Sequence, residues 1–237
     1  MLKVLYVTAG FYPFETGGMQ AVSRRHLEIL HANGFNVISV ESSEQKSIKT
    51  LPWRNIFVKW PNRSALDELS PYKYVNDLKR YSESILILID SIKPDIIYSE
   101  GPLLYSYLKR KREVRVPTIF HPHGLEPFQN SGSIITNLKT LPLKSIIRFH
   151  CNMCDQVVSL SQKGVIYNIL QKLTSYRKNK IFYIPNTTTL DVVKSKKDLK
   201  KNNNKSRFIF IGRNEPRKGI KLVLDIFSIK DIGNLKI

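Results

Sequence analysis

The 237-residue sequence contains no apolar stretch long enough to cross a membrane. The longest apolar run, Ile85 to Ile89, is far shorter than the roughly 20 residues that a membrane helix needs. Near the N-terminus, the apolar segment Leu2 to Val7 includes Lys3 and is too short for the core of a signal peptide. These absences predict a cytoplasmic protein.

Cysteine is scarce, which limits disulfide and metal chemistry. The only two cysteines, Cys151 and Cys154, form a single C-x2-C pair. A structural zinc site needs four ligands, and no second Cys/His pair lies at a suitable spacing. We interpret both residues as packed thiols of a reducing compartment, with a metal or redox role as the alternative.

Acidic residues are scarce in one part of the chain. The net charge is +19, and residues 1–100 contribute only +1 of it, whereas residues 101–237 contribute +18. Such a field attracts nucleic acid, anionic bilayers and phosphorylated ligands alike, although part of the lysine excess can reflect genome composition. No recognised nucleic-acid module and no basic patch interleaved with aromatic residues is present, so we expect no specific nucleic-acid partner.

What the sequence does contain is an alternation of strand and helix patterns. We predict a doubly wound α/β domain with a mostly parallel sheet over residues 1–190. The predicted strands are Leu2–Val7, Phe35–Val40, Ile56–Trp60, Ile96–Tyr98, Pro117–Phe120, Asp155–Leu160 and Lys180–Asn186. The predicted helices follow Gly18, span Tyr72–Ile92, open at Pro102 and span Leu143–Met153, and the inner stripe of the first comprises Met19, Val22, His26, Ile29 and Leu30.

The segment from 191 to 206 is rich in Lys and Asn and is predicted to be an interdomain linker. Residues 207–237 then begin a second strand–turn–helix unit, with a strand at Phe208–Ile211 and a further strand at Leu235–Ile237. A nucleotide-binding domain usually takes on the order of 100 residues. We therefore expect a complete N-terminal domain and only a fragment of a C-terminal domain.

Two turns are suited to binding an anion, because each joins a strand to a helix through glycine. The first ends in Gly17 and Gly18, and the second carries Arg213 and Lys218 between Gly212 and Gly219. Free backbone N–H groups at such a turn can hold a phosphate. No G-x-G-x-x-G is present, which argues against a dinucleotide fingerprint. The alternative for the first turn is an ordinary strand–helix connection, and the alternative for the second is that Arg213 and Lys218 are solvated cations at the start of a helix.

A polar loop that follows the strand Pro117–Phe120 supplies the candidate catalytic side chains. It contains His121, His123 and Glu126. Imidazole donates or accepts a hydrogen bond near neutral pH, which suits it to a sugar hydroxyl. Taken alone, a histidine in a loop is more often a surface residue.

Several of these segments match one known family. Gly212-Arg213 with Lys218-Gly219 resembles the G-R-x4-K-G signature of family 4 glycosyltransferases, retaining enzymes of the GT-B fold that use nucleotide-sugar donors. The glycine pair, the His-Gly pair at His123, the run from Cys154 to Ser161 and the Ile184-Pro185-Asn186 turn match in the same order along the chain. Thr187 stands where that family has glycine, which puts a close backbone approach there in doubt.

The resemblance implies retaining transfer of a sugar from a nucleotide donor to a hydroxyl acceptor, with no metal and no other cofactor. Arg213, Lys218, Gly17 and Gly18 would bind the donor diphosphate, and His123 would be the catalytic residue that orients the acceptor or the reacting sugar. His121 is the runner-up to His123, and Glu126 is a weaker acceptor-side candidate. The basic surface fits a lipid-linked glycan or a surface polysaccharide intermediate as the acceptor. It also fits peripheral attachment to the inner face of an anionic membrane.

The alternative is an inactive, truncated homologue that serves as a membrane- or partner-binding module. The acidic E-x7-E motif of the family has no counterpart in this sequence. We therefore expect that the chain by itself does not turn over a sugar donor.

Overall fold

The computed structural model describes residues 1–11, 17–42, 51–59, 71–110, 115–128, 134–175, 180–186, 207–209, 219–229 and 234–236. The chain divides into two compact units, Met1–Thr188 and Thr189–Ile237. Each unit is described by itself.

The first unit alternates strands with helices, as the sequence pattern predicts. Its strands are β1 (Lys3–Val7), β2 (Asn36–Glu41), β3 (Arg54–Phe57), β4 (Ile96–Glu100), β5 (Thr118–His121), β6 (Gln156–Ser159) and β7 (Ile181–Tyr183). Its helices are α1 (Gly18–Ala32), α2 (Pro71–Ile92), α3 (Tyr105–Lys109), α4 (Ile134–Lys139), α5 (Leu141–Met153) and α6 (Val165–Leu173), with a 3-10 turn, η1, at Glu126–Phe128.

All seven strands form one parallel sheet in the order β3-β2-β1-β4-β5-β6-β7. The chain builds outward from β1 through β2 to β3, then returns to the other side of β1 with β4. The point between β1 and β4 is therefore the switch point of the sheet, beside which α/β folds bind their ligands at the carboxyl ends of the strands. This is the predicted Rossmann-like architecture with a parallel sheet.

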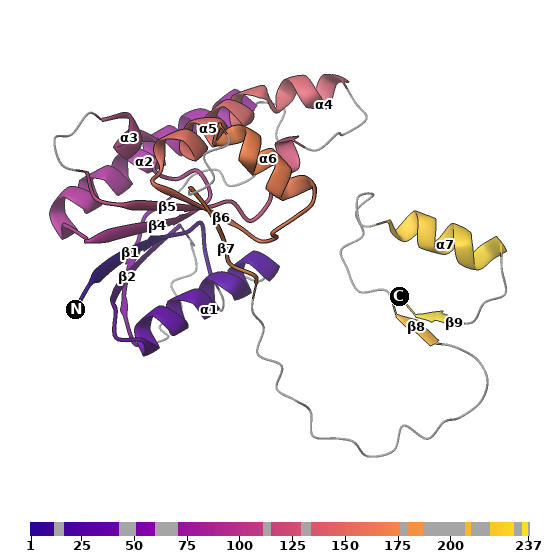
Figure 1. The fold of residues 1–237 in the computed structure, drawn as a ribbon, viewed down its shortest axis with the longest axis horizontal. Coiled ribbons are helices and arrows are strands. Elements are labelled where there is room, and N and C mark those ends of the chain that lie inside the picture. The colour runs from indigo at the N-terminus through magenta and orange to yellow at the C-terminus, as the bar shows by residue number, and fades with distance from the viewer. Residues whose placement is uncertain are drawn as a thin grey trace, which may run out of the picture. The chain divides into compact units, whose positions relative to one another are not determined.

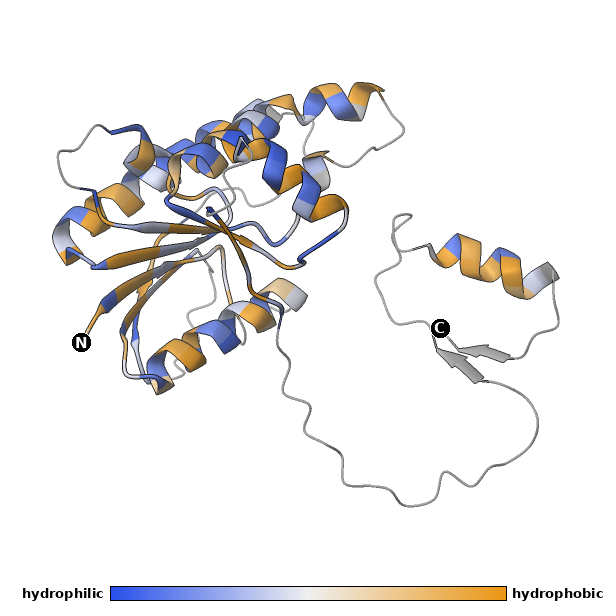
Figure 2. Ribbon diagram, in the orientation of Figure 1, coloured by the Kyte–Doolittle hydropathy of each residue, from blue (hydrophilic) through white to orange (hydrophobic). Residues whose placement is uncertain are grey.

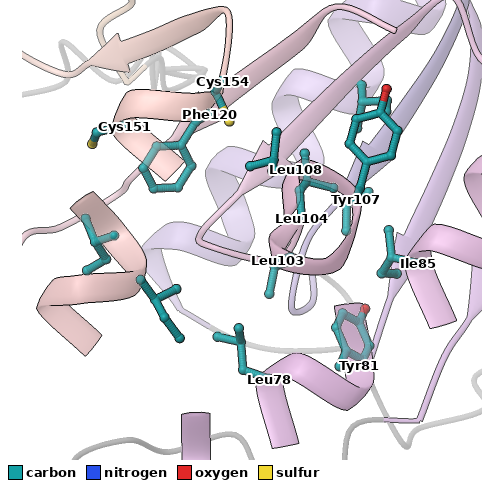
Figure 3. Packing of buried hydrophobic residues seen from close by; sticks show 14 of the residues in the cluster. Leu78, Tyr81, Ile85, Leu103, Leu104, Tyr107, Leu108, Phe120, Cys151 and Cys154 are labelled. Carbon is teal, nitrogen blue, oxygen red and sulfur yellow. The ribbon is translucent and has the colours of Figure 1, made fainter. Parts of the chain in front are cut away.

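Helices cover the two faces of the sheet unequally (Figure 1). The larger core lies between the sheet and helices α2, α3, α5 and α6, and includes Leu5, Val7, Ile97 and Phe120. Figure 3 shows side chains of α2 and α3 packed together in it, with Phe120 and both cysteines nearby. Both thiols are buried, and burial raises the pKa of each to about 12, which keeps them as inert packed thiols.

The smaller core lies under α1, on the opposite face. Tyr6, Phe11, Leu27, Val37 and Trp53 are buried there. The alternation of side chains along a strand explains the division, because Leu5 and Val7 of β1 face one core and Tyr6 faces the other. Figure 2 shows the corresponding mixture of hydrophobic and hydrophilic residues along α1.

The predicted inner stripe of α1 is correct in part. Leu30 packs against the smaller core, whereas Ile29 is exposed and the two buried residues, Ser23 and Leu27, were not predicted. The hydroxyl of Ser23 donates a hydrogen bond to the buried carboxylate of Glu100, a contact that an apolar pattern does not reveal. His26 is correctly placed on the inward side, with a side chain only 12% exposed.

Several strand ends also differ from the prediction. β3 ends at Phe57 rather than Trp60, and β4 continues beyond Tyr98 to Glu100. Ser99 and Glu100 are polar, yet both are buried and paired with β5 in the parallel ladder. This extension of β4 brings a carboxylate to the edge of the sheet.

The second unit contains β8 (Arg207–Ile209), α7 (Ile220–Ile229) and β9 (Asn234–Lys236). β8 and β9 pair in parallel, the arrangement expected of the strand–helix–strand pattern. Gly219, just before α7, has φ 74°, a left-handed conformation that glycine adopts without strain. Among the described residues, no helix is both long and apolar enough to span a membrane.

Candidate functional site

The carboxyl ends of β4 and β5 bring together a cluster of polar side chains on the α1 face of the sheet. Glu100 is the last residue of β4 and His121 the last residue of β5, and the two are register partners. His123 lies two residues beyond β5, and His26 reaches the cluster from α1. Parallel strands that end at one edge next to a switch point make this convergence unavoidable.

Glu100 is the centre of the cluster. Its side chain has no exposed surface, so its charge must be stabilised by the protein. The hydroxyl of Tyr6 donates to Oε1 and that of Ser23 donates to Oε2. His123 Nε2 lies 2.9 Å from Oε1 and His26 Nδ1 lies 3.5 Å from it. The carboxylate therefore has donors on both oxygens.

The imidazoles lie side by side. The rings of His121 and His123 are 4.1 Å apart, and those of His26 and His121 are 5.6 Å apart. His121 Nδ1 lies 2.7 Å from the hydroxyl of Tyr98, and the ring of Tyr98 stacks on Tyr6 at 4.9 Å and 8°. Stacked tyrosines and their hydroxyls thus hold both the carboxylate and one imidazole in place.

This environment fixes the charges of the cluster. Burial favours the neutral form of Glu100, but its hydrogen bonds and charge interactions, chiefly with His123 and His26, outweigh burial and hold its pKa well below the usual range. Burial, helped by the neighbouring His123, lowers the pKa of His121 to about 3. Burial and the charge of Glu100 raise the pKa of Tyr6 and Tyr98 well above the usual value. At neutral pH the site holds an anionic carboxylate, neutral tyrosines and a neutral His121.

Such an arrangement can orient and polarise a hydroxyl group. The imidazole of His123 is 10% exposed, and its Nε2 lies 2.9 Å from Oε1 of Glu100, a charge contact that favours one orientation of the ring. A ring held in this way presents its other edge in a defined direction, so a hydroxyl that binds there is positioned as well as hydrogen-bonded.

The structure places some of the predicted site residues in this cluster and others elsewhere. The structure brings His121 and His123 together, and both are buried or nearly so rather than surface residues. Gly18 begins α1, and Gly17 precedes it with φ 154°. A β-carbon on Gly17 would lie 2.3 Å from the end of the Gln20 side chain, which is flexible and could move aside, so the positive φ rather than lack of space favours glycine here. Glu126 begins η1. Arg213 and Lys218 lie outside the described residues.

Sequence reasoning missed Tyr6, Ser23, Tyr98 and Glu100. Two of them are aromatic residues inside strands and resemble ordinary core residues. Glu100 did carry a signal, because a charged residue that ends a buried strand next to Gly101-Pro102 sits at the edge where parallel-sheet sites form.

The comparison with protein families decides the identity of the chain. The sequence profile described as Glycosyltransferase Family 4 matches residues 16–192, which is most of the chain. The chain belongs to this family. The match includes the glycine pair of the first turn and the whole histidine–glutamate cluster apart from Tyr6.

Solved structures place this family 4 chain in the GT-B fold. Sucrose-phosphate synthase from Thermosynechococcus elongatus aligns with a TM-score of 0.66 and 16% identity over 99% of this chain and 61% of its own. Starch synthase IV from Arabidopsis thaliana, bound to ADP and acarbose, aligns with a TM-score of 0.67 and 14% identity over 99% of this chain and 67% of its own.

The lipopolysaccharide outer core galactosyltransferase WaaB gives a TM-score of 0.60 and 12% identity over 99% of this chain and 59% of its own. The chain thus spans about three fifths to two thirds of the length of these three structures. A search of curated proteins returns no match. The predicted family and fold class are confirmed.

Proposed function

We propose that the first unit is the acceptor-side domain of a retaining glycosyltransferase that moves a sugar from a nucleotide-sugar donor to a hydroxyl acceptor. The observation that carries this proposal is the pairing of His123 with the buried Glu100, 2.9 Å apart, at the carboxyl edge of a family 4 sheet. His123 orients the acceptor hydroxyl or the reacting sugar, and Glu100 keeps the imidazole in place.

A transfer assay with radiolabelled nucleotide-sugars and membrane extract as acceptor, with a C-terminal nucleotide-binding domain of the family supplied in trans, tests this role. His123→Ala should lower the transfer rate by about a hundredfold or more, because positioning and proton transfer each contribute at that scale. His31→Ala is the matched control, since His31 lies exposed at the end of α1. Full transfer by the His123→Ala protein would refute the assignment.

Arg213 and Lys218, and separately the glycine turn at Gly17 and Gly18, are proposed as residues that bind the donor diphosphate, without a metal. Cationic side chains and free backbone N–H groups offset the charge of a departing diphosphate. Calorimetric titration with nucleoside diphosphates should show a loss of about 1.5–3 kcal/mol for Arg213→Ala or Lys218→Ala. Equal affinity in the wild-type protein and in both variants would remove this assignment.

A lipid-linked glycan acceptor, and attachment to the inner face of a membrane, are favoured by one surface. Ile134, Ile135 and Leu138 of α4 and Leu141 at the start of α5 are 79%, 67%, 60% and 52% exposed. Between residues 127 and 190 the sequence has eight Lys or Arg and a single acidic residue, Asp155. Exposed apolar groups amid uniformly positive charge fit an anionic lipid surface.

The same surface supports the second candidate function, a membrane-binding module without transfer activity. Co-sedimentation with anionic vesicles should weaken as salt rises and should fall for Ile135→Glu and Leu138→Glu. Ile87→Glu is the control, because Ile87 is 69% exposed on α2. Binding that did not depend on lipid charge, or equal binding by all variants, would contradict the proposal that this surface binds anionic lipid. Salt-sensitive binding to DNA of comparable strength would show that the positive charge attracts anions nonspecifically.

A further inference from the structure

Three of the five histidines in the sequence, His26, His121 and His123, gather around Glu100. One ring nitrogen each of His26 and His121 and one carboxylate oxygen of Glu100 all lie within 4.8 Å of one another. The three residues come from α1, β5 and β4, so only the tertiary fold assembles them. We propose that His26, Glu100 and His121 bind one divalent transition-metal ion of the Zn²⁺ class.

The distances are close to those of a metal centre. Zinc lies about 2.0–2.2 Å from imidazole nitrogens and carboxylate oxygens, so two tetrahedral ligand atoms are about 3.4 Å apart. His26 Nδ1 and Glu100 Oε1 are 3.5 Å apart, which already matches. The widest separation in the set, 4.8 Å at most, has to close by about 1.4 Å, which a side-chain rotation supplies.

His121 is the second, independent indication. The residue is fully buried, and its Nε2 has no hydrogen-bond partner among the described residues. An unpaired buried nitrogen is costly, and a metal ion would satisfy it. If Nδ1–H donates to the Tyr98 hydroxyl 2.7 Å away, Nε2 carries the free lone pair. A metal-binding histidine usually has just such a hydrogen bond on its other nitrogen.

The donor set selects the class of ion. Two imidazole nitrogens with one carboxylate oxygen suit Zn²⁺, Co²⁺ and Ni²⁺, whereas Mg²⁺ and Ca²⁺ prefer oxygen ligands only. A fourth position would remain for water. An ion held here would compete with any hydroxyl that binds His121 or His123.

Calorimetric titration of the untagged chain with ZnCl₂, without any sugar donor, measures the site directly. We expect one ion per chain, and no such binding after His26→Ala or His121→Ala. His31→Ala should bind as the wild type does, because His31 lies exposed elsewhere on α1. Tyr98→Phe should bind about 10–100-fold more weakly, since it removes only the hydrogen bond that orients His121. Undiminished one-to-one binding in the His26 and His121 variants would overturn the site.

Co²⁺ absorption of the wild-type protein is a second measurement that does not depend on how well variants fold. We expect ligand-field bands of a four-coordinate nitrogen–oxygen site that MgCl₂ does not displace and ZnCl₂ does. A thiolate-to-cobalt band would place the ion on Cys151 and Cys154 and refute the proposal, as would the absence of any bands. Because no donor is present, failure of this test leaves the proposed sugar transfer standing, and failure of transfer leaves the metal site standing.

Discussion

At the scale of single residues, two buried carboxylates of the first unit differ in their hydrogen-bond partners and therefore in their pKa. Glu100 has hydroxyl donors on both oxygens and imidazoles beside it, so its charge is stabilised inside the protein. Glu41, at the end of β2, has the amide of Asn55 on Oε1 at 2.7 Å, and its Oε2 has no hydrogen-bond partner among the described residues. Burial accordingly raises the pKa of Glu41 to about 7.

This raised pKa predicts a pH-dependent stability. The unfolded carboxyl titrates near 4.5 and the folded one near 7, so between these values the folded protein keeps a proton that the unfolded chain has lost. Stability should therefore fall as pH rises through that window. Glu41→Gln should be close to neutral at pH of about 4.5 and stabilising by up to about 3 kcal/mol at pH of about 8.

Urea unfolding at those two pH values checks the prediction. Glu28→Gln is the control, because Glu28 forms a partly exposed ion pair with Arg24 on α1. If Glu41→Gln were no more stable than the wild type at the higher pH, the carboxylate of Glu41 would have to be stabilised by groups other than Asn55.

At the scale of elements, Asp155 joins β6 to β5. Its Oδ2 accepts hydrogen bonds from the backbone N–H and the hydroxyl of Thr118, both at 2.8 Å, and its Oδ1 lies 3.2 Å from Arg115. The backbone N–H of Asp155 donates to the Thr118 hydroxyl in return, at 3.1 Å. This reciprocal contact ties the start of β6 to the start of β5, the strand that ends at His121.

Asp155→Ala should therefore destabilise the first unit by about 1–3 kcal/mol, because it leaves the Thr118 donors unsatisfied. Thermal or urea unfolding measures the loss. Asp90→Ala is the matched control, since the exposed Asp90–Arg110 pair at 3.2 Å should contribute only about 0–1 kcal/mol. Equal losses in the two variants would show that Asp155 acts as an ordinary surface charge.

At the scale of the whole molecule, we expect the first unit to fold without the second. Every residue of both buried cores described above belongs to Met1–Thr188. A chain that ends at Thr188 should therefore unfold cooperatively, with a midpoint within about 2–4 °C of that of the full chain. Circular dichroism during heating tests this, and a broad or strongly lowered transition would mean that the second unit contributes to the core.

The sequence by itself determined the class of fold, the family and the edge of the sheet where the histidines would lie. Strand and helix periodicity are local properties, and His121 and His123 follow a strand directly, so both conclusions need only neighbouring residues. The roles proposed for Gly17, Gly18, Glu126, Arg213 and Lys218 stay predictions, as do the absence of a cofactor, the membrane partner and the domain boundaries.

Only the tertiary structure decided that Glu100 is the centre of the site. Its partners Tyr6, Ser23 and His123 come from β1, α1 and the loop after β5, and no local pattern links residues that are 94, 77 and 23 positions away from it. The same contacts involve the buried Ser23 of α1 and the last residue of β4, two polar positions that an apolar pattern does not assign to the interior. Polar burial depends on partners that are distant in sequence, which is why apolar periodicity predicted the layers of this protein but not the cluster between them.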